Sequence, residues 1–170
     1  MREPKIVAEI GCNHMGDMSI AKEMINVAKT FCKVDMVKFQ KRNPRESLTD
    51  KEFNSPHPVP FHSYGQTYGE HRENLEFGLD SHKELKEFCD ANEVDYSTSV
   101  WDVTSAIEIA KLNPSMVKIP SACNTFYDLI STCCDNFSGQ IHISFGMTSH
   151  QEEEQILGWL NAKGRAKDCV

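Results

Sequence analysis

The chain has 170 residues, of which 25% are charged and 39% hydrophobic, and its formal net charge at pH 7 is −7. This length and composition are typical of one globular domain and exclude the disordered and collagen-like classes. The negative charge argues against a nucleic-acid partner, because neutralising phosphates requires a basic surface. The sequence contains neither an apolar segment long enough to span a bilayer nor the apolar core of a signal peptide. We therefore expect a cytoplasmic protein with no nucleic-acid or membrane partner.

The chain alternates strand-like apolar runs with helical patterns. Strands are expected at about 6–11, 35–40, 95–99, 116–120 and 140–144, and helices at about 19–32, 81–92, 103–111, 125–134 and 150–163. Asp80 or Ser81 is expected to cap the second helix. A polar excursion from Lys41 to Asp80 interrupts the alternation, and residues 67–77 within it are expected to be helical. The last seven residues, GRAKDCV, read as a turn and the opening of another strand.

Strands that alternate with helices predict a parallel sheet with right-handed crossovers. An open doubly wound sheet and part of an eight-stranded barrel are the two competing topologies. Polar residues at the carboxyl end of every strand, rather than at one switch point, favour the barrel. No GxGxxG or Walker A motif is present, which weakens a nucleotide-binding alternative. We therefore predict a partial (β/α)8 TIM barrel of about five βα units, with the chain cut at the sixth strand.

The seven cysteines are scattered, without CxxC pairs or a companion histidine pattern. Cys133 and Cys134 are adjacent, which suits neither a zinc site nor an ordinary disulfide framework. We expect reduced thiols.

Two lysines lie inside short apolar runs, Lys38 in MVKFQ (36–40) and Lys118 in MVKIPS (116–121). Lysine is almost never fully buried unless it is paired or functional. Strand alternation places Lys38 and Gln40 on one face of their strand. In a barrel both ammonium groups can reach one pocket, where a phosphate or carboxylate between them relieves their repulsion. The plainer alternative is a half-solvated strand whose polar residues face water.

Hydroxyl groups complete an expected anion site. Thr98, Ser121 and Ser144 lie at neighbouring strand ends and would help to bind a phosphorylated carboxylic acid. A Schiff base, in which one lysine lowers the pKa of the other, is an alternative for the lysine pair. Glu9 is suited to be a general base, a hydroxyl-binding carboxylate or an internal counter-ion of the lysines. Gln40 is suited to binding sugar hydroxyls or orienting a water molecule.

Five motifs occur together in this chain: IVAEIGCNHMGD (6–17), VKFQ (37–40), TYGEHRENLEF (67–77), KIPSACN (118–124) and SFGMTS (144–149). In this order and spacing they resemble the sialic acid synthase family, of the N-acetylneuraminate synthase type. The resemblance covers essentially the whole chain. It implies a (β/α)8 barrel that condenses phosphoenolpyruvate with N-acetylmannosamine or a related sugar. It also implies a divalent metal (manganese or magnesium) and, at full length, a homodimer with a C-terminal antifreeze-like domain.

Residue by residue, the resemblance implies roles for seven positions. Those that resemble the phosphoenolpyruvate-binding set are Lys38, Thr98, Lys118, Ser121 and Ser144, and those that approach the sugar acceptor, with catalytic roles, are Glu9 and Gln40. The chain departs from the pattern of many members at three positions, Pro120, Cys123 and Phe145, which leaves the sugar undetermined. The metal-binding histidines of the family come from later strands, so no metal ligand is assigned here.

The resemblance thus makes residues 1–170 the N-terminal part of a TIM-barrel synthase domain, with the later strands and the antifreeze-like domain absent. Two other readings stay open. One is a non-catalytic half-barrel that serves as a module or assembly partner. The other is a related phosphoenolpyruvate condensation that takes an aldose phosphate.

Overall fold

The sheet has five parallel strands, and a computed structural model describes it together with the rest of residues 4–170. The strands are β1 (Val7–Gly11), β2 (Met36–Lys41), β3 (Asp95–Val100), β4 (Met116–Ile119) and β5 (Gln140–Ile143). They pair in the order β1-β2-β3-β4-β5, each with the next strand along the chain. A doubly wound sheet reverses its strand order at one point, whereas a barrel does not. The order is therefore that of a partial (β/α)8 barrel with five βα units.

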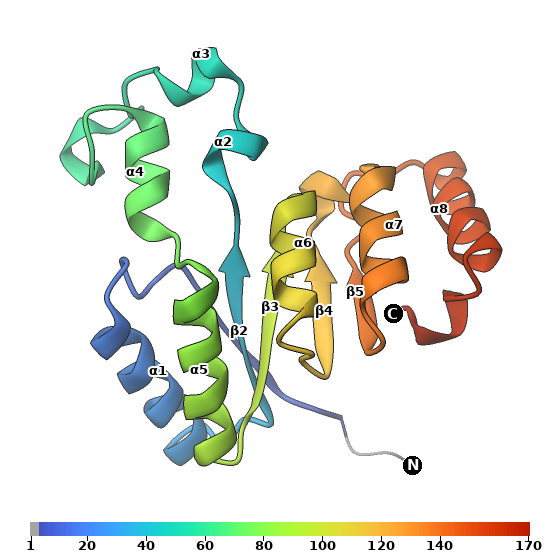
Figure 1. Ribbon diagram of the computed structural model, residues 1–170, viewed down its shortest axis with the longest axis horizontal. Coiled ribbons are helices and arrows are strands. Elements are labelled where there is room, and N and C mark those ends of the chain that lie inside the picture. Colours follow the sequence, from blue (N-terminus) through green and yellow to red (C-terminus); the bar gives the residue numbers. More distant parts are fainter. Residues whose placement is uncertain (1–3) are drawn as a thin grey trace.

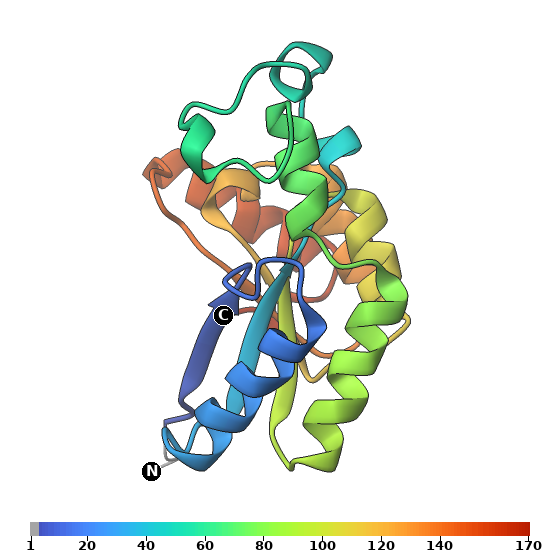
Figure 2. The same cartoon turned by 90° about the vertical axis from the view of Figure 1, so that its left-hand side faces the viewer.

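Long helices follow the strands and lie on one side of the sheet, which we call the outer face (Figures 1 and 2). They are α1 (Met18–Thr30), α5 (Leu79–Ala91), α6 (Val103–Ala110), α7 (Tyr127–Asn136) and α8 (His150–Ala162). One buried apolar cluster joins β2 and β3 to α1 and α5, with Phe39 and Leu85 fully buried. A second joins β4 and β5 to α6, α7 and α8, with Ile119 and Ile156 fully buried. The outer face is thus the hydrophobic core.

The end of the chain returns to the sheet after η3 (Ala166–Asp168). Cys169 forms a parallel bridge with Ile141. Val170 N donates to Ile141 O at 3.0 Å, and Ile143 N donates to Val170 O at 2.9 Å. These contacts place residues 169–170 beside β5, at the edge where another strand was expected to open.

Helix starts differ from expectation at three places, since α1, α5 and α7 begin at Met18, Leu79 and Tyr127 instead of at about 19, 81 and 125. Asp17 caps α1, since its Oδ1 accepts from Ser19 N at 2.7 Å, and the helix starts at Met18, one residue earlier than expected. The expected cap of α5 at Asp80 or Ser81 is wrong, because Gly78 precedes the helix and makes no side-chain cap bond. Asp80 instead lies in the first turn, where a carboxylate interacts favourably with the helix dipole.

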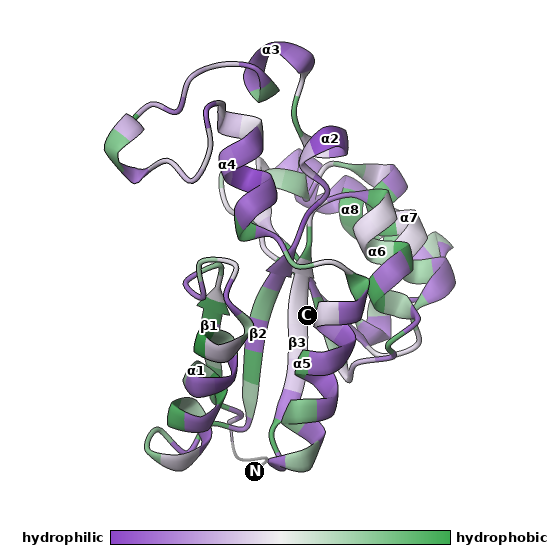
Figure 3. Cartoon of the chain, turned by 60° about the vertical axis from the view of Figure 1, so that its left-hand side comes forward, coloured by the Kyte–Doolittle hydropathy of each residue, from purple (hydrophilic) through white to green (hydrophobic). Residues whose placement is uncertain are grey.

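The polar excursion between β2 and α5 is built from short helices. They are α2 (Pro44–Ser47), α3 (Asp50–Phe53), η1 (Pro60–His62) and α4 (Tyr68–Leu75). This segment lies beyond the carboxyl ends of the strands (Figures 1 and 2). The helix expected within 67–77 is confirmed as α4, which Thr67 and Glu70 start with a reciprocal capping box. Figure 3 shows that α4 is mostly hydrophilic, which suits a helix that covers the end of the sheet rather than its core.

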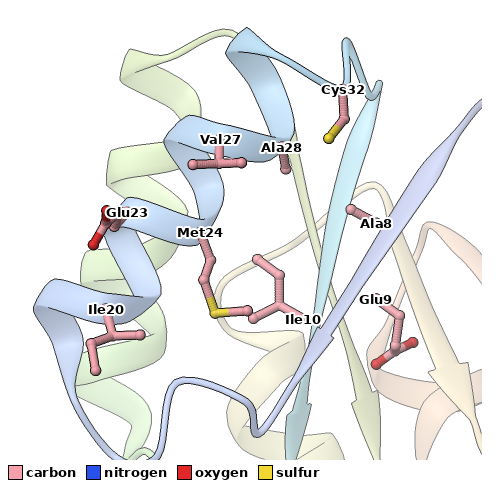
Figure 4. A pocket seen from close by; sticks show the side chains of 9 residues that line it. All are labelled: Ala8, Glu9, Ile10, Ile20, Glu23, Met24, Val27, Ala28 and Cys32. Atoms are coloured by element: carbon pink, nitrogen blue, oxygen red, sulfur yellow. The ribbon is translucent and has the colours of Figure 1, made fainter.

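An apolar groove of about 390 Å³ lies between β1 and α1, on the outer face at the edge of the sheet. Ile10 and Met24 face each other across it, whereas the Glu9 carboxylate points to the other side of β1 (Figure 4). Glu9 thus borders the groove, but its carboxylate lies on the other face of the sheet.

Two further sequence expectations concern the chain as a whole. All seven cysteines are free thiols in the structure. Across residues 4–170, no helix has the length and apolar character needed to cross a membrane.

Candidate active site

The inner face of the sheet, opposite the helices, carries the polar strand residues in two rows. In the first row, Lys38 lies in register with Glu9 of β1 and Ser97 of β3. The second row, one step closer to the carboxyl ends of the strands, runs through Gln40, Ser99, Lys118 and His142. Because paired residues in a parallel ladder point to the same face, these side chains line one concave surface.

Lys38 is 7% exposed, and its ammonium group contacts two inner-face residues. Nζ donates to the Glu9 carboxylate and, at 3.2 Å, to Ser99 Oγ. Burial, together with the smaller effect of the charge of Lys118, lowers the pKa of Lys38 to about 8. In this structure Glu9 thus acts as the counter-ion of Lys38, one of the three roles expected from sequence.

Ser99 takes the place that the sequence assigned to Thr98. Ser99 hydrogen-bonds Lys38 and lies in register with Lys118, so it stands between the two lysines. Thr98 is fully buried and pairs with Phe39, a residue of the outer core. It shares the outer face with Tyr96 and is not brought to the lysines. A shift of one residue along a strand reverses the face, and this shift explains the difference.

Lys118 and the two expected serines lie on adjoining elements. Ser121 begins η2 (Ser121–Cys123), directly after β4, and Ser144 follows β5. The two segments touch, since a Cβ added to Gly146 would lie 2.9 Å from Ser121 Cβ and 3.2 Å from Ser121 Oγ. Asn124 ties them together, donating from its side-chain amide to Ser144 O at 3.0 Å and to Thr148 Oγ1 at 2.7 Å.

Gln40 faces inward with Lys38 by strand alternation, and Gly11 of β1 leaves space beside its side chain. Gly11 adopts a φ of +60°, at a register irregularity in the pairing of β1 with β2. A Cβ at Gly11 would lie 3.3 Å from Gln40 Nε2 and 3.6 Å from Glu9 Oε1. Glycine therefore lets the two predicted acceptor-side residues lie next to each other.

A third layer lies past the ends of β2 and β3. Arg42 Cζ is 4.7 Å from the centroid of the Trp101 ring. Arg42 Nε donates to Glu76 Oε1 at 2.7 Å, and Arg72 Nη2 donates to the same oxygen at 3.2 Å. The Glu76 side chain is only 6% exposed; burial raises its pKa, and Arg42 acts in the opposite direction. Glu76 thereby fastens the excursion to the strand ends.

The histidines near the site do not form a metal centre. His14 is buried and stacks on Phe77 with ring centroids 4.1 Å apart, and burial lowers its pKa. His142 faces inward beside Lys118, and burial, followed by the charge of Lys118, lowers its pKa. Within residues 4–170, no three side chains of histidine, cysteine, aspartate or glutamate gather into a metal-binding group. The described residues therefore do not provide a site for the divalent metal that the resemblance implies.

Sequence reasoning missed four residues of this arrangement, namely Ser99, Asn124, Arg42 and Glu76. Ser99 and Arg42 follow from strand alternation once the register with Lys38 is known. Asn124 and Glu76 lie within the quoted motifs KIPSACN and TYGEHRENLEF, but only the structure shows what they contact.

Comparison with known proteins adds an independent line of evidence. A family model described as NeuB family matches residues 24–170. An N-acetylneuraminate-9-phosphate synthase from Drosophila melanogaster is 35% identical over 164 residues, covering 94% of this chain and 42% of its own length. An N,N'-diacetyllegionaminic acid synthase from Campylobacter jejuni is 27% identical over 170 residues, covering all of this chain and 50% of its own length. The chain thus spans half or less of these relatives.

Solved structures agree on the fold. An N-acetylneuraminic acid synthetase from Leptospira borgpetersenii superposes with a TM-score of 0.78 at 23% identity, covering 96% of this chain and 52% of that one. A truncated 3-deoxy-D-arabino-heptulosonate 7-phosphate synthase from Thermotoga maritima gives 0.62 at 10% identity, covering 98% and 49%. These likenesses confirm the expected partial barrel, and the family match extends over most of the sequence. The chain therefore belongs to the NeuB family, the family of the sialic acid synthases.

Proposed function

We propose that this chain carries the phosphoenolpyruvate-binding part of a synthase that condenses phosphoenolpyruvate with an N-acylated hexosamine, such as N-acetylmannosamine. The product is a sialic-acid-type nonulosonic acid, and inorganic phosphate is released. Membership of the NeuB family supports the reaction class. The observation that carries the proposal is the placement of Lys38 and Lys118 around Ser99 on the inner face.

Phosphoenolpyruvate bears a carboxylate and a phosphate, and the site offers complementary groups. Lys38 and Lys118 supply two positive charges at the carboxyl end of the sheet, and an anion between them offsets their repulsion. Ser121 and Ser144 supply hydroxyl donors on adjoining loops. With a pKa of about 8, Lys38 is mostly protonated at neutral pH, which suits anion binding better than the Schiff-base alternative.

The proposed chemistry forms one bond and breaks another. C3 of phosphoenolpyruvate attacks the aldehyde carbon of the open-chain sugar, forming the new C–C bond while positive charge develops at C2. Water then adds to C2 and gives one proton to the alkoxide formed from the aldehyde oxygen. The C2–O bond to phosphate breaks, phosphate leaves with the electron pair and the second proton, and C2 becomes a keto group. Glu9 would accept a proton and Gln40 would hold the acceptor or the water, and the position of both residues beside Lys38 on the inner face supports these roles. The resemblance implies a divalent metal, but no step is assigned to one, since the described residues do not form its site.

The same proposal covers the setting of the reaction. A biosynthetic enzyme that consumes phosphoenolpyruvate and a free sugar would act in the cytoplasm. A homodimer is proposed for the whole protein on the strength of the family resemblance alone.

Calorimetric titration with phosphoenolpyruvate tests the site. Lys118→Met should abolish binding, because it removes one of the two positive charges while keeping the length of the side chain. Lys111→Met is the matched control, since Lys111 is an exposed residue at the end of α6 and should bind as the wild type does. Unchanged binding by Lys118→Met would contradict the proposal. Offering N-acetylmannosamine, its 6-phosphate and diacetamido-hexoses side by side would then identify the acceptor.

A further inference from the structure

The third layer of inward side chains has no role in the chemistry proposed above. On β2 the inward positions are 38, 40 and 42, and on β3 they are 97, 99 and 101. Trp101 N donates to Lys41 O at 3.3 Å, so the two strands are still joined where Arg42 and Trp101 leave them. Two residues along a strand span about 6.6 Å. Arg42 therefore lies one step beyond Gln40, at the mouth of the inner face.

The mouth holds two guanidinium groups and one shared carboxylate. The side chains of Arg42 and Arg72 are 14% and 16% exposed, and both donate to Oε1 of Glu76. Cys12 Sγ lies 3.3 Å from Arg42 Nη2, but burial raises the pKa of this thiol, so it carries no charge at neutral pH. Two largely buried positive charges thus share one negative charge.

Asp102 is the other buried carboxylate near the mouth, and it is committed elsewhere. Its two oxygens accept from the backbone N–H groups of Asn43 and Ser105, each at 2.7 Å. It therefore caps α6 and holds the start of the excursion. Asp102 makes no ion pair with either arginine within residues 4–170.

Arg42 retains hydrogen-bonding capacity. Its recorded side-chain bonds engage Nε with Glu76 and Nη2 with Cys12, and within residues 4–170 Nη1 has no partner. A cation–π contact with Trp101 and the hydrogen bond to Glu76 restrain the position of the guanidinium group. A buried charge is favourable only when it is paired, and a guanidinium group held in one plane matches the geometry of a phosphate.

We propose that Arg42 is a specificity residue that binds a phosphate monoester on the end of the acceptor sugar furthest from its aldehyde carbon. This inference rests on the proposed function. The aldehyde carbon has to meet phosphoenolpyruvate at the rows of Lys38 and Lys118. Arg42 lies about 6.6 Å beyond the row of Gln40 and Lys118 along the strand direction. An open-chain hexosamine that extends outward from this row would bring its last carbon to Arg42. Arg72 shares the positive charge, and Glu76 positions both arginines.

The test compares acceptor binding by four forms of the intact chain in calorimetric titrations with saturating phosphoenolpyruvate. The forms are the wild type, Arg42→Met, Arg42→Lys and Arg45→Met. The probes are N-acetylmannosamine and N-acetylmannosamine 6-phosphate. Arg45 is the matched control, because it is an exposed arginine three residues away that pairs with Glu73.

We expect the wild type and Arg45→Met to bind the phosphorylated sugar at least about tenfold more tightly than the unphosphorylated one. Arg42→Met should lose this preference and keep its affinity for phosphoenolpyruvate, and Arg42→Lys should restore part of it by returning the charge. If Arg42→Met does not fold, Arg42→Lys still decides, since it should weaken the preference severalfold.

Three results would overturn the inference while phosphoenolpyruvate still binds. These are equal affinity of the wild type for both sugars, no binding of the phosphorylated sugar, and an unchanged preference in the Arg42 variants. Loss of phosphoenolpyruvate binding by the wild type itself would instead refute the proposed function.

Discussion

The two faces of the sheet use the same strands for different purposes. On the outer face, Phe39 and Val117 pack against helices and are almost completely buried. On the inner face lie their sequence neighbours Lys38 and Lys118, and the long helices are on the opposite side of the sheet (Figure 2). Each lysine is thus adjacent in sequence to a core residue and points the opposite way.

This contrast shows how stability and binding can be separated within a single strand. The outer residues stabilise the fold because they bury apolar surface. The inner residues lose hydration on folding, and only a few polar contacts compensate for that loss. The lowered pKa of Lys38, whose largest cause is burial, agrees with that cost. Substitutions on the outer face should therefore change stability, and those on the inner face should change binding.

The largest expected effect is on the outer face. Phe39→Ala should lower the free energy of unfolding by about 3–5 kcal/mol, because it removes a fully buried aromatic ring. The adjacent change Lys38→Met should alter it by less than about 1 kcal/mol, since the Glu9 carboxylate left behind is half exposed. Urea unfolding of both variants measures the difference. Equal destabilisation by the two substitutions would show that the faces are not separable in this way.

The next effect is a pH dependence on the inner face. An anion binds better to protonated Lys38, so phosphoenolpyruvate affinity should be constant below pH 8 and fall by up to about tenfold per pH unit above it. The sign follows from the lowered pKa, because in the free protein the proton is lost at about pH 8 rather than above pH 10. Titration calorimetry between pH 7 and 9.5 measures it.

Lys38→Arg provides the control, because arginine stays charged throughout this range. Its affinity should show no inflection near pH 8. An inflection of the same size in this variant would assign the titration to another group.

A smaller effect is expected where the two serine loops meet. Gly146→Ala should weaken phosphoenolpyruvate binding about tenfold, equivalent to about 1.4 kcal/mol, because the added Cβ would press on Ser121. Gly158→Ala is the matched control, since a Cβ there meets no atom within 4 Å. It lies within α8 and should stabilise the chain slightly without changing binding. Equal binding by both variants would argue against a role for Ser121.

Most of the fold could be predicted because each element carries a local pattern. Alternating strands and helices predict the parallel sheet, and polar residues at every strand end favour a barrel, which the unreversed strand order confirms. Helix starts were less predictable. A side-chain cap can be recognised by its residue type, whereas Gly78 precedes α5 and offers no side chain to identify it.

Site residues could be predicted where the pattern of a single strand identifies them. They could not be predicted where the site is formed by contacts between two distant segments. Lys38 and Lys118 stand out because lysine is rare in apolar strands. The contacts of Arg42 with Glu76 join residues 34 positions apart, and no periodicity links them. The register of β3 was the remaining ambiguity. Ser97, Thr98 and Ser99 are all hydroxyl residues, so polarity alone cannot show which of them face inward.

The smallest expected effect tests which hydroxyl residue of β3 faces inward. Ser99→Ala should weaken phosphoenolpyruvate binding about threefold, because it removes one hydrogen bond to Lys38 while Glu9 still holds the ammonium group. Thr98→Val is nearly the same size, changes the adjacent residue and should leave binding unchanged, since Thr98 points into the outer core. Calorimetry of the two variants at pH 7 decides between them. Weaker binding in Thr98→Val alone would restore the assignment made from the sequence and move the register of β3 by one residue. Such a shift would also turn Tyr96 out of the core. An equal melting temperature of the wild type and Tyr96→Phe would therefore support the shift, and a lower melting temperature of Tyr96→Phe would support the register described here.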